Sequence, residues 1–368
     1  MKPILPLAAL ALAACAEPET SPSEMPPETA LAQRITALHD ENGDVPGFAF
    51  AIIEAGGGMI SGASGVADPE GAPMTPATPL RMASITKTIV AAAVLRLMEE
   101  GEIDLDSPIG PLVGEDVLAL LSGDGYDLGA ITVRHLLMHS GGFADHAQTE
   151  AYLDQVFSER SKVWSPEEQI GVLVAETDPL SAPGEAFAYS DSGYVLLGLI
   201  IEGLTGRPLH EAVRELTKLD ALGLERTWWD GEEPQPEGAL PRAHQYVNGA
   251  PTHDIHGSID AHGGGGLIAS VEEVALFYAS LFKGEVFEDP STLDLMITAP
   301  GHPEGSPYRI GLFTGEIDGV RIYSHGGFWG TYVSIRPDSG RVVSGAALDQ
   351  SGYGPMRGLL RELLIDGL

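Results

Sequence analysis

The segment that most constrains the fold of this chain is a long apolar run, SITKTIVAAAVLRLMEE, which spans residues 84–100. Its apolar side chains recur at the spacing of one helical face, which predicts a buried amphipathic helix. These side chains are Ile89, Val90, Ala93, Val94, Leu97 and Met98. We therefore take this helix as the centre around which the rest of the chain is organised.

Ser84 and Lys87 stand at the start of this run, so their side chains lie on one face of the predicted helix, one turn apart. A serine hydroxyl is a poor nucleophile until a neighbouring group takes its proton. A lysine can take that proton only if burial or a nearby charge lowers its pKa towards neutrality. Taken alone, the pair is more simply explained by a serine that caps the helix and a lysine that extends to solvent.

The charge balance of the chain is strongly acidic and excludes one broad class of partner. Lys and Arg total 20 and Asp and Glu total 53 in 368 residues, which gives a formal net charge of −33. Such a surface repels nucleic-acid backbones and anionic lipid headgroups, so we expect no nucleic-acid partner. At 43% hydrophobic residues, the chain can bury a large core in one domain or in two closely packed domains.

Residues 1–14 are typical of a lipoprotein signal peptide, with one lysine and an apolar run too short to span a bilayer as a permanent helix. The run ends in LAAC, which resembles the lipobox of bacterial lipoproteins, in which Cys15 would become the lipidated first residue. Ala16 in place of aspartate implies delivery to the outer membrane. We therefore expect a protein of the bacterial cell envelope at the periplasmic face of that membrane, attached only through Cys15. Residues 15–30, rich in Pro, Ser and Glu, predict a disordered tether.

Metal or cofactor chemistry has little support in the sequence. Cys15 is the only cysteine, so a disulfide, a cysteine metal cluster and a cysteine nucleophile are all excluded. A loop before four consecutive glycines is rich in possible zinc ligands, but no helical spacing orders them. These are His253, Asp254, His256, Asp260 and His262. We therefore expect neither a metal nor a cofactor.

The order of sequence patterns predicts an α/β (α+β) fold. Residues 31–43 are typical of a helix that stops at a glycine, and residues 48–68 predict a β-hairpin around three glycines. Helical patterns dominate from about 104 to 250, strand patterns return in the last third, and a helix closes the chain. We expect an antiparallel sheet flanked by helices, with an all-helical subdomain at roughly 104–250. The whole of 31–368 then forms one domain.

Two further segments carry residues with chemical potential. Tyr189 and Asp191 stand just before an apolar helical run, and a tyrosine at such a helix start can pass protons if a cation lowers its pKa. His325, Gly326 and Gly327 end one predicted strand, where glycines let the backbone approach a ligand and leave N–H groups free for a developing oxyanion. Taken alone, each segment is also compatible with ordinary packing or an ordinary hairpin.

Together, the three segments resemble the serine β-lactamase and penicillin-binding-protein family. Its motifs run S-x-x-K, Y-x-N, and K-T-G or H-x-G, and here they correspond to Ser84-x-x-Lys87, Tyr189-x-Asp191 and His325-x-Gly327. The flanking text, such as HLLMHSGG and GGGGLIASVEEVALF, is similar as well. The resemblance covers roughly residues 45–350 and is strongest to the class C-like branch, which also holds DD-carboxypeptidases, D-aminopeptidases and esterases. It implies the β-lactamase/transpeptidase-like fold.

The resemblance implies a role for each motif residue. Ser84 would be the acylated nucleophile, and Lys87 and Tyr189 would share the acid and base work, with the first proton acceptor left open. The backbone N–H groups of Ser84 and Phe328 would form the oxyanion hole. His325 would line the pocket, and with Asp191, Gly326 and Gly327 it would contact the substrate.

Two departures from the family pattern bear on the substrate. Asp191 replaces the usual asparagine, and a carboxylate beside Lys87 would raise the lysine pKa and move the base role towards Tyr189. Gly326 replaces a threonine that offers a hydroxyl to the substrate carboxylate. Both departures favour neutral or amine-bearing esters, amides or small peptides over β-lactams.

We therefore expect a serine hydrolase that forms an acyl-enzyme on Ser84 with a small-molecule or peptide substrate. One alternative is a β-lactamase or DD-carboxypeptidase that acts on cell-wall peptides. A second is a non-catalytic relative that binds peptidoglycan or peptides through the same pocket. The sequence leaves the oligomeric state and the identity of the acyl group open.

Overall fold

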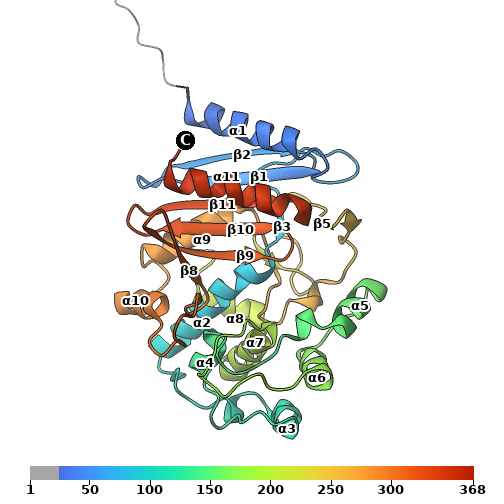
Figure 1. Ribbon diagram of the computed structural model, residues 1–368, viewed down its shortest axis with the longest axis vertical. Helices are drawn as coiled ribbons and strands as arrows, with labels where there is room; N and C mark the ends of the chain where they lie inside the picture. The colour runs from blue at the N-terminus through green and yellow to red at the C-terminus, as the bar shows by residue number, and fades with distance from the viewer. Residues whose placement is uncertain (1–24) are drawn as a thin grey trace, which may run out of the picture.

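The computed structural model describes residues 25–368, and its centre is a six-stranded antiparallel sheet (Figure 1). The sheet joins the two ends of the chain, because the first strand pairs with the last. Its strands in spatial order are β2 (Met59–Gly65), β1 (Gly47–Ile53), β11 (Arg341–Ala347), β10 (Thr331–Arg336), β9 (Val320–Gly327) and β8 (Phe313–Ile317).

Strand β1 is buried along its whole length because the sheet is covered on both faces. Side chains alternate between the faces of a strand. Phe48, Phe50 and Ile52 therefore pack on one side with α1 (Pro27–Glu41) and α11 (Tyr353–Ile365). The alanines between them face the larger core on the other side, where α9 (Val271–Phe282) crosses β1 and β11.

The second half of the molecule is a group of helices below the sheet in Figure 1. Helix α2 (Thr86–Glu99) runs between the sheet and this group, and 12 of its residues, Thr86–Leu97, are buried. The other helices of the group are α3 (Glu115–Gly123), α4 (Val133–Leu137), α5 (Glu150–Ser158), α6 (Pro166–Glu176), α7 (Asp191–Thr205) and α8 (Leu209–Leu216), and α10 (Pro290–Thr298) lies at the edge.

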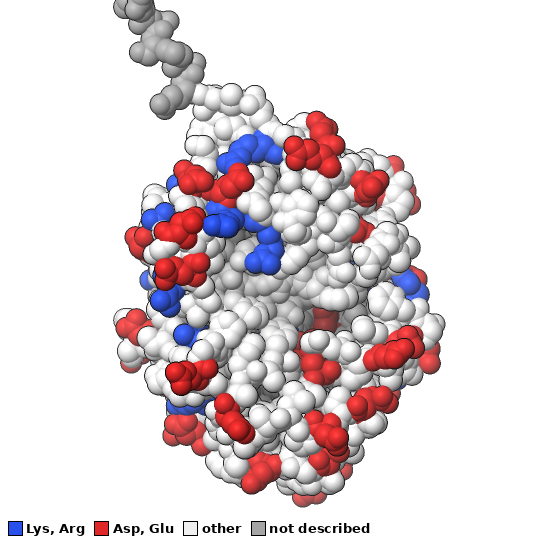
Figure 2. Space-filling model, in the orientation of Figure 1, with Lys and Arg blue, Asp and Glu red and all other residues white. Residues whose placement is uncertain are grey.

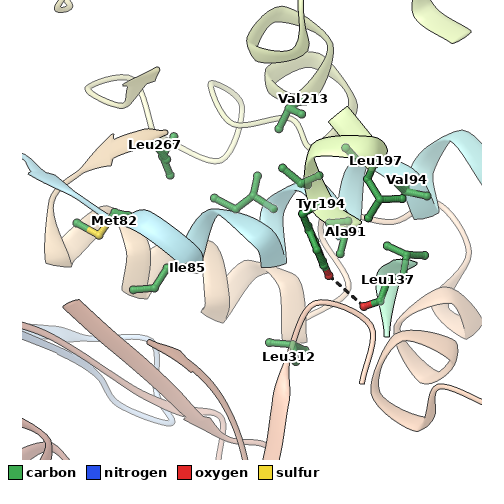
Figure 3. Packing of buried hydrophobic residues seen from close by; sticks show 14 of the residues in the cluster. Met82, Ile85, Ala91, Val94, Leu137, Tyr194, Leu197, Val213, Leu267 and Leu312 are labelled. Atoms are coloured by element: carbon green, nitrogen blue, oxygen red, sulfur yellow. Dashed lines mark hydrogen bonds between the residues drawn. The ribbon is translucent and has the colours of Figure 1, made fainter. Parts of the chain in front are cut away.

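Two small sheets join the helical group to the main sheet. One holds β3 (Leu80–Arg81), β7 (Leu267–Ala269) and β4 (Trp228–Trp229), and the other pairs β5 (Tyr246–Val247) with β6 (Ala250–Pro251). The buried side chains of α2, α4 and α7 interlock in a single core beside them (Figure 3). Among residues 25–368, no helix is both long and apolar enough to cross a bilayer.

The predicted fold class is confirmed, with two differences in element boundaries. Helix α1 begins at Pro27, so residues 27–30 of the predicted tether are helical, since a proline is well placed in the first helical turn. The last helix of the predicted helical subdomain ends at Leu216, and residues 217–250 form turns and short strands. The expected signal peptide, Cys15 and most of the tether lie outside the described residues.

Candidate active site

Ser84 lies in a 3₁₀ turn, Ala83–Ile85, and not in the first turn of the α-helix as the sequence suggested. Ala83 has a φ of +47°, a left-handed conformation that is unfavourable for a residue with a Cβ. Such strain is held by surrounding structure and is concentrated at functional sites. Here the turn places Ser84 between β9 and the N-terminus of α2, where it lines two cavities.

Lys87 is fully buried, and its ammonium group has three partners. Its Nζ lies 2.9 Å from Ser84 Oγ and 2.6 Å from Asp191 Oδ1, and it donates to the Gly264 carbonyl. Burial by itself lowers the pKa of Lys87, but the Asp191 carboxylate and the Tyr189 hydroxyl outweigh it and raise the pKa above its ordinary value. Lys87 is therefore held as an ammonium ion, which disfavours it as the acceptor of the Ser84 proton.

Tyr189 stands two residues before α7, so its ring lies over Lys87 at 5.2 Å from Nζ to the ring centroid. The ring of His139 packs against it at 4.2 Å. Burial raises the pKa of Tyr189 to about 12, against the lowering effect of the Lys87 charge and of interactions with Ser84. Tyr189 therefore reaches both the nucleophile and the lysine, as the family resemblance implied.

His139 supports Tyr189 from behind. Its Nδ1 accepts the backbone N–H of Ser190 at 3.2 Å, which holds the segment that carries Tyr189. Burial, and then the charge of Lys87, lower the pKa of His139 well below its ordinary value, so the ring is neutral.

Asp191 begins α7 and faces two other carboxylates that the motif comparison missed. Asp145 Oδ1 accepts the backbone N–H of Asp191 at 3.2 Å, and Asp260 lines the same cavity. Burial, then the charge of Asp191, raises the pKa of Asp145 to about 7, and burial raises that of Asp260 to about 6. The only sequence signal for Asp145 is its place just after HSGG, and Asp260 stood in the loop considered for zinc.

The third motif lies at the end of β9, across the cavity from α7. His325 is buried, its Nε2 lies 3.0 Å from the Tyr308 hydroxyl, and its Nδ1 contacts the Gly326 carbonyl. Burial, then the charge of Lys87, lowers the pKa of His325 to about 3. His325 therefore lines the cavity as a neutral ring and supplies no positive charge to a substrate there.

The glycines after His325 are required by close contacts. A Cβ at Gly327 would lie 2.2 Å from the Met82 carbonyl oxygen, so only glycine lets β9 approach the Ser84 turn. A Cβ at Gly326 would lie 2.2 Å from the Tyr353 hydroxyl. A tyrosine from α11 thus fills the space of the threonine expected from the family, and places a hydroxyl on the cavity wall.

Phe328 follows β9, is half exposed and lines both cavities beside Ser84. Its position is compatible with the predicted oxyanion hole, and the backbone N–H roles of Ser84 and Phe328 stay a prediction. The cavity beside β9 and α11 has a volume of about 670 Å³, and the one beside α5 and α7 about 520 Å³. Figure 2 shows this region as the hollow at the centre of the face.

Four of the five residues considered as zinc ligands have separate partners. Asp254 pairs with Arg160, His262 contacts the Trp164 carbonyl, His256 contacts the Ser258 hydroxyl, and His253 stacks on His244 at 3.7 Å. Across the part of the chain that the structure describes, no group of three His, Cys, Asp or Glu side chains is arranged to hold a metal ion.

Comparisons with known proteins identify the family. The Beta-lactamase family model matches residues 31–361. Esterase EstB of Burkholderia gladioli is 30% identical over 272 residues, which cover 66% of this chain and 68% of the esterase.

Solved structures of other proteins share the fold of this chain. The D-stereospecific amidohydrolase from Streptomyces sp. aligns with a TM-score of 0.77 at 27% identity, over 93% of this chain and all of that one (100%). The octameric penicillin-binding protein homologue from Pyrococcus abyssi aligns with a TM-score of 0.73 at 26% identity, over 91% and 76% of the two chains. The chain therefore belongs to the β-lactamase family of serine hydrolases.

Proposed function

We propose that this protein hydrolyses neutral or amine-bearing esters, amides or small peptides through a covalent acyl-enzyme on Ser84. One observation carries the proposal: a buried ammonium, Lys87, lies 2.9 Å from the Ser84 hydroxyl and is itself neutralised by Asp191. This arrangement orients and polarises the nucleophile. The same intact constellation argues against a non-catalytic binding protein.

Tyr189 is the proton acceptor in this proposal. Removing the proton from Lys87 would leave the Asp191 carboxylate without its cation in a largely buried position, which is strongly unfavourable. Removing the proton from Tyr189 instead creates a phenolate beside an ammonium, which is a stabilised pair. The phenolate–ammonium form is therefore the reactive one, and because the pKa of Tyr189 is raised to about 12 it is a minor form at neutral pH, reached when the phenol loses its proton to water.

The reaction then proceeds in two steps, acylation of Ser84 and hydrolysis of the acyl-enzyme. The Ser84 Oγ–H proton passes to the Tyr189 oxygen while Oγ bonds to the substrate carbonyl carbon. The tetrahedral intermediate collapses, the bond to the leaving oxygen or nitrogen breaks, and the proton on Tyr189 passes to the leaving group. A water molecule attacks the acyl-enzyme, gives its proton to Tyr189, and the bond to Ser84 breaks as Oγ regains a proton.

The decisive test is Ser84→Ala. It should abolish turnover and leave the fold intact, since loss of a nucleophile that acts together with its base typically lowers kcat on the order of a millionfold. A fluorophosphonate should phosphonylate Ser84 with loss of fluoride in the native protein, seen as a mass increase, and should leave the variant unlabelled. Unchanged activity in Ser84→Ala, or loss of activity with a chelator, would overturn the serine mechanism.

Asp191→Asn tests the preference for amines over β-lactams. We expect wild type to hydrolyse a neutral ester and an amine-bearing amide with a higher kcat/KM than a cephalosporin, because Asp191 repels an anionic substrate. In the variant, kcat/KM for the cephalosporin should rise relative to kcat/KM for the neutral ester and for the amide. A wild type that prefers the cephalosporin, with no relative change in Asp191→Asn, would favour the alternative β-lactamase or DD-carboxypeptidase function.

We further propose that the protein is a lipoprotein, anchored through Cys15 to the periplasmic face of the outer membrane. The support is the LAAC ending of the apolar run and the small residue that follows it. Labelled fatty acid should be incorporated into the protein, and Cys15→Ser should prevent it. Two or more acyl chains anchor stably, whereas one does not. Recovery of the native protein unlipidated would overturn this proposal.

A further inference from the structure

The cavity beside β9 and α11 holds a cation that the proposed chemistry does not use. Arg357, on the first turns of α11, lines the same cavity as Ser84 and Tyr189. Its guanidinium group stacks over the rings of Tyr332 and Tyr353, at 4.6 Å and 5.5 Å from their centroids. An aromatic support of this kind holds a guanidinium without neutralising it.

Among the described basic residues without an ion pair, Arg357 is the one that lines the cavity of Ser84. It is exposed, and no carboxylate among residues 25–368 forms an ion pair with it, although Asp and Glu outnumber Lys and Arg by 53 to 20. Arg361, one turn further along α11, is paired with Asp318 at 3.2 Å. Arg357 therefore offers free N–H donors to an anion in the cavity, where a planar guanidinium suits a carboxylate.

The other cavity has the opposite charge. Asp145, Asp191 and Asp260 line it, and Lys87 lies beside Asp191. Figure 2 shows the same contrast, with basic side chains at one edge of the central hollow and acidic ones on its opposite side. Ser84 lines both cavities, so the nucleophile stands between the two charges.

The acidic cavity also has an apolar wall. Tyr152, Leu153, Val156 and Phe157 line it from α5. A ligand group that carries both an ammonium and an apolar side chain is complementary to this cavity. The ammonium lies near the carboxylates, and the apolar side chain packs on the residues of α5, away from water.

We propose that the substrate is bipolar, a short peptide with a free amine in its acyl half and a free carboxylate in its leaving half. This inference rests on the proposed function and names its substrate class. In a dipeptide the amide lies between the two charged ends, as Ser84 lies between the two cavities. Hydrolysis consumes one water and releases two amino acids, with the leaving amine taking the proton from Tyr189.

A matched pair of substrates tests the carboxylate end. Phenylalanine, in both enantiomers, is coupled to 4-aminobenzoic acid and to 4-aminobenzamide, whose leaving groups differ in charge and hardly in size. We expect wild type to prefer the carboxylate by about tenfold in kcat/KM, as for one charge-assisted hydrogen bond. Arg357→Gln should bring this ratio close to one, Arg357→Lys should retain part of it, and Arg361→Gln should keep the wild-type ratio.

The amine end is tested with the N-acetylated forms of the same two compounds. Acetylation should lower kcat/KM about tenfold or more, and Asp145→Asn should reduce that difference while leaving the carboxylate ratio as in wild type. A wild-type carboxylate ratio of one or below, or a ratio unchanged in Arg357→Gln, overturns the inference. Turnover of none of these anilides, with Ser84 still labelled by fluorophosphonate, overturns it and leaves the proposed function standing, whereas an unlabelled Ser84 would overturn the proposed function itself.

Discussion

At the scale of single residues, the site depends on how its carboxylates share one ammonium. Lys87 pairs with Asp191 directly, and Asp145 stands behind Asp191 with a pKa raised to about 7 by burial and by the neighbouring charge. Asp145 is therefore neutral in mild acid and becomes ionised as the pH passes through neutrality. The acidic cavity gains a negative charge in that range.

This titration predicts a pH dependence. For an amide whose amine stays protonated to pH 9, kcat/KM relative to a neutral ester should rise between about pH 5 and 8, and Asp145→Asn should remove the rise. The folded state holds a proton on Asp145 that the unfolded chain releases near 3.8, so stability falls as the pH rises from about 4 to 7. Asp145→Asn should therefore raise the Tm more at pH 8 than at pH 4, and a profile identical to wild type would contradict this assignment.

A second prediction at this scale concerns Gly326 and Tyr353. Gly326→Ala places a Cβ on the Tyr353 hydroxyl, so the tyrosine must move and kcat/KM should fall. In a Tyr353→Ala background the same substitution should have little further effect. Steady-state kinetics on the four proteins gives the coupling between the two positions. Equal effects of Gly326→Ala in both backgrounds would show that the two residues do not compete for this space.

At the scale of elements, α2 and α7 position the catalytic residues and pack against each other through their buried faces. Leu197 on α7 and Val94 on α2 lie in the same core, and the Tyr194 hydroxyl donates to the Leu137 carbonyl at 3.0 Å (Figure 3). Ser84 precedes one of these helices and Asp191 begins the other, so their packing sets the distance between nucleophile and carboxylate.

Leu197→Ala should lower the free energy of unfolding by about 2–5 kcal/mol, because it opens a cavity in this core. Leu120→Ala is the matched control, a leucine on helix α3 that is 38% exposed, and its effect should be within about 1 kcal/mol. Urea unfolding of the three proteins measures both values. Equal losses in the two variants would place the stabilising core elsewhere.

At the scale of the whole molecule, the net charge of −33 acts on every charged ligand that approaches. A cationic substrate is attracted over a distance set by the salt concentration, with a Debye length of about 30 Å at 0.01 M and about 3 Å at 1 M. We expect kcat/KM for an amine-bearing amide to fall several-fold between these salt concentrations, and that for a neutral ester to stay nearly constant. Parallel salt dependence for both substrates would exclude electrostatic attraction as the cause.

The sequence by itself determined the features that depend on local patterns. The hairpin of β1 and β2, the helix after Ser84 and the order of the three motifs follow from alternation, helical spacing and glycine turns, which involve residues close together in the chain. The pairing of Lys87 with Asp191 was also anticipated, because both belong to motifs that converge in the family.

Only the tertiary structure decided what surrounds those motifs. Asp145, the Gly264 carbonyl, and Tyr353 with Arg357 come from three distant segments, and no local periodicity marks them. Their contacts exist because the last helix covers the sheet that the first strands begin, and because the helical group closes over α2. Burial and the neighbouring charges in that assembly set the pKa shifts, and the same packing places a basic cavity and an acidic one on either side of Ser84.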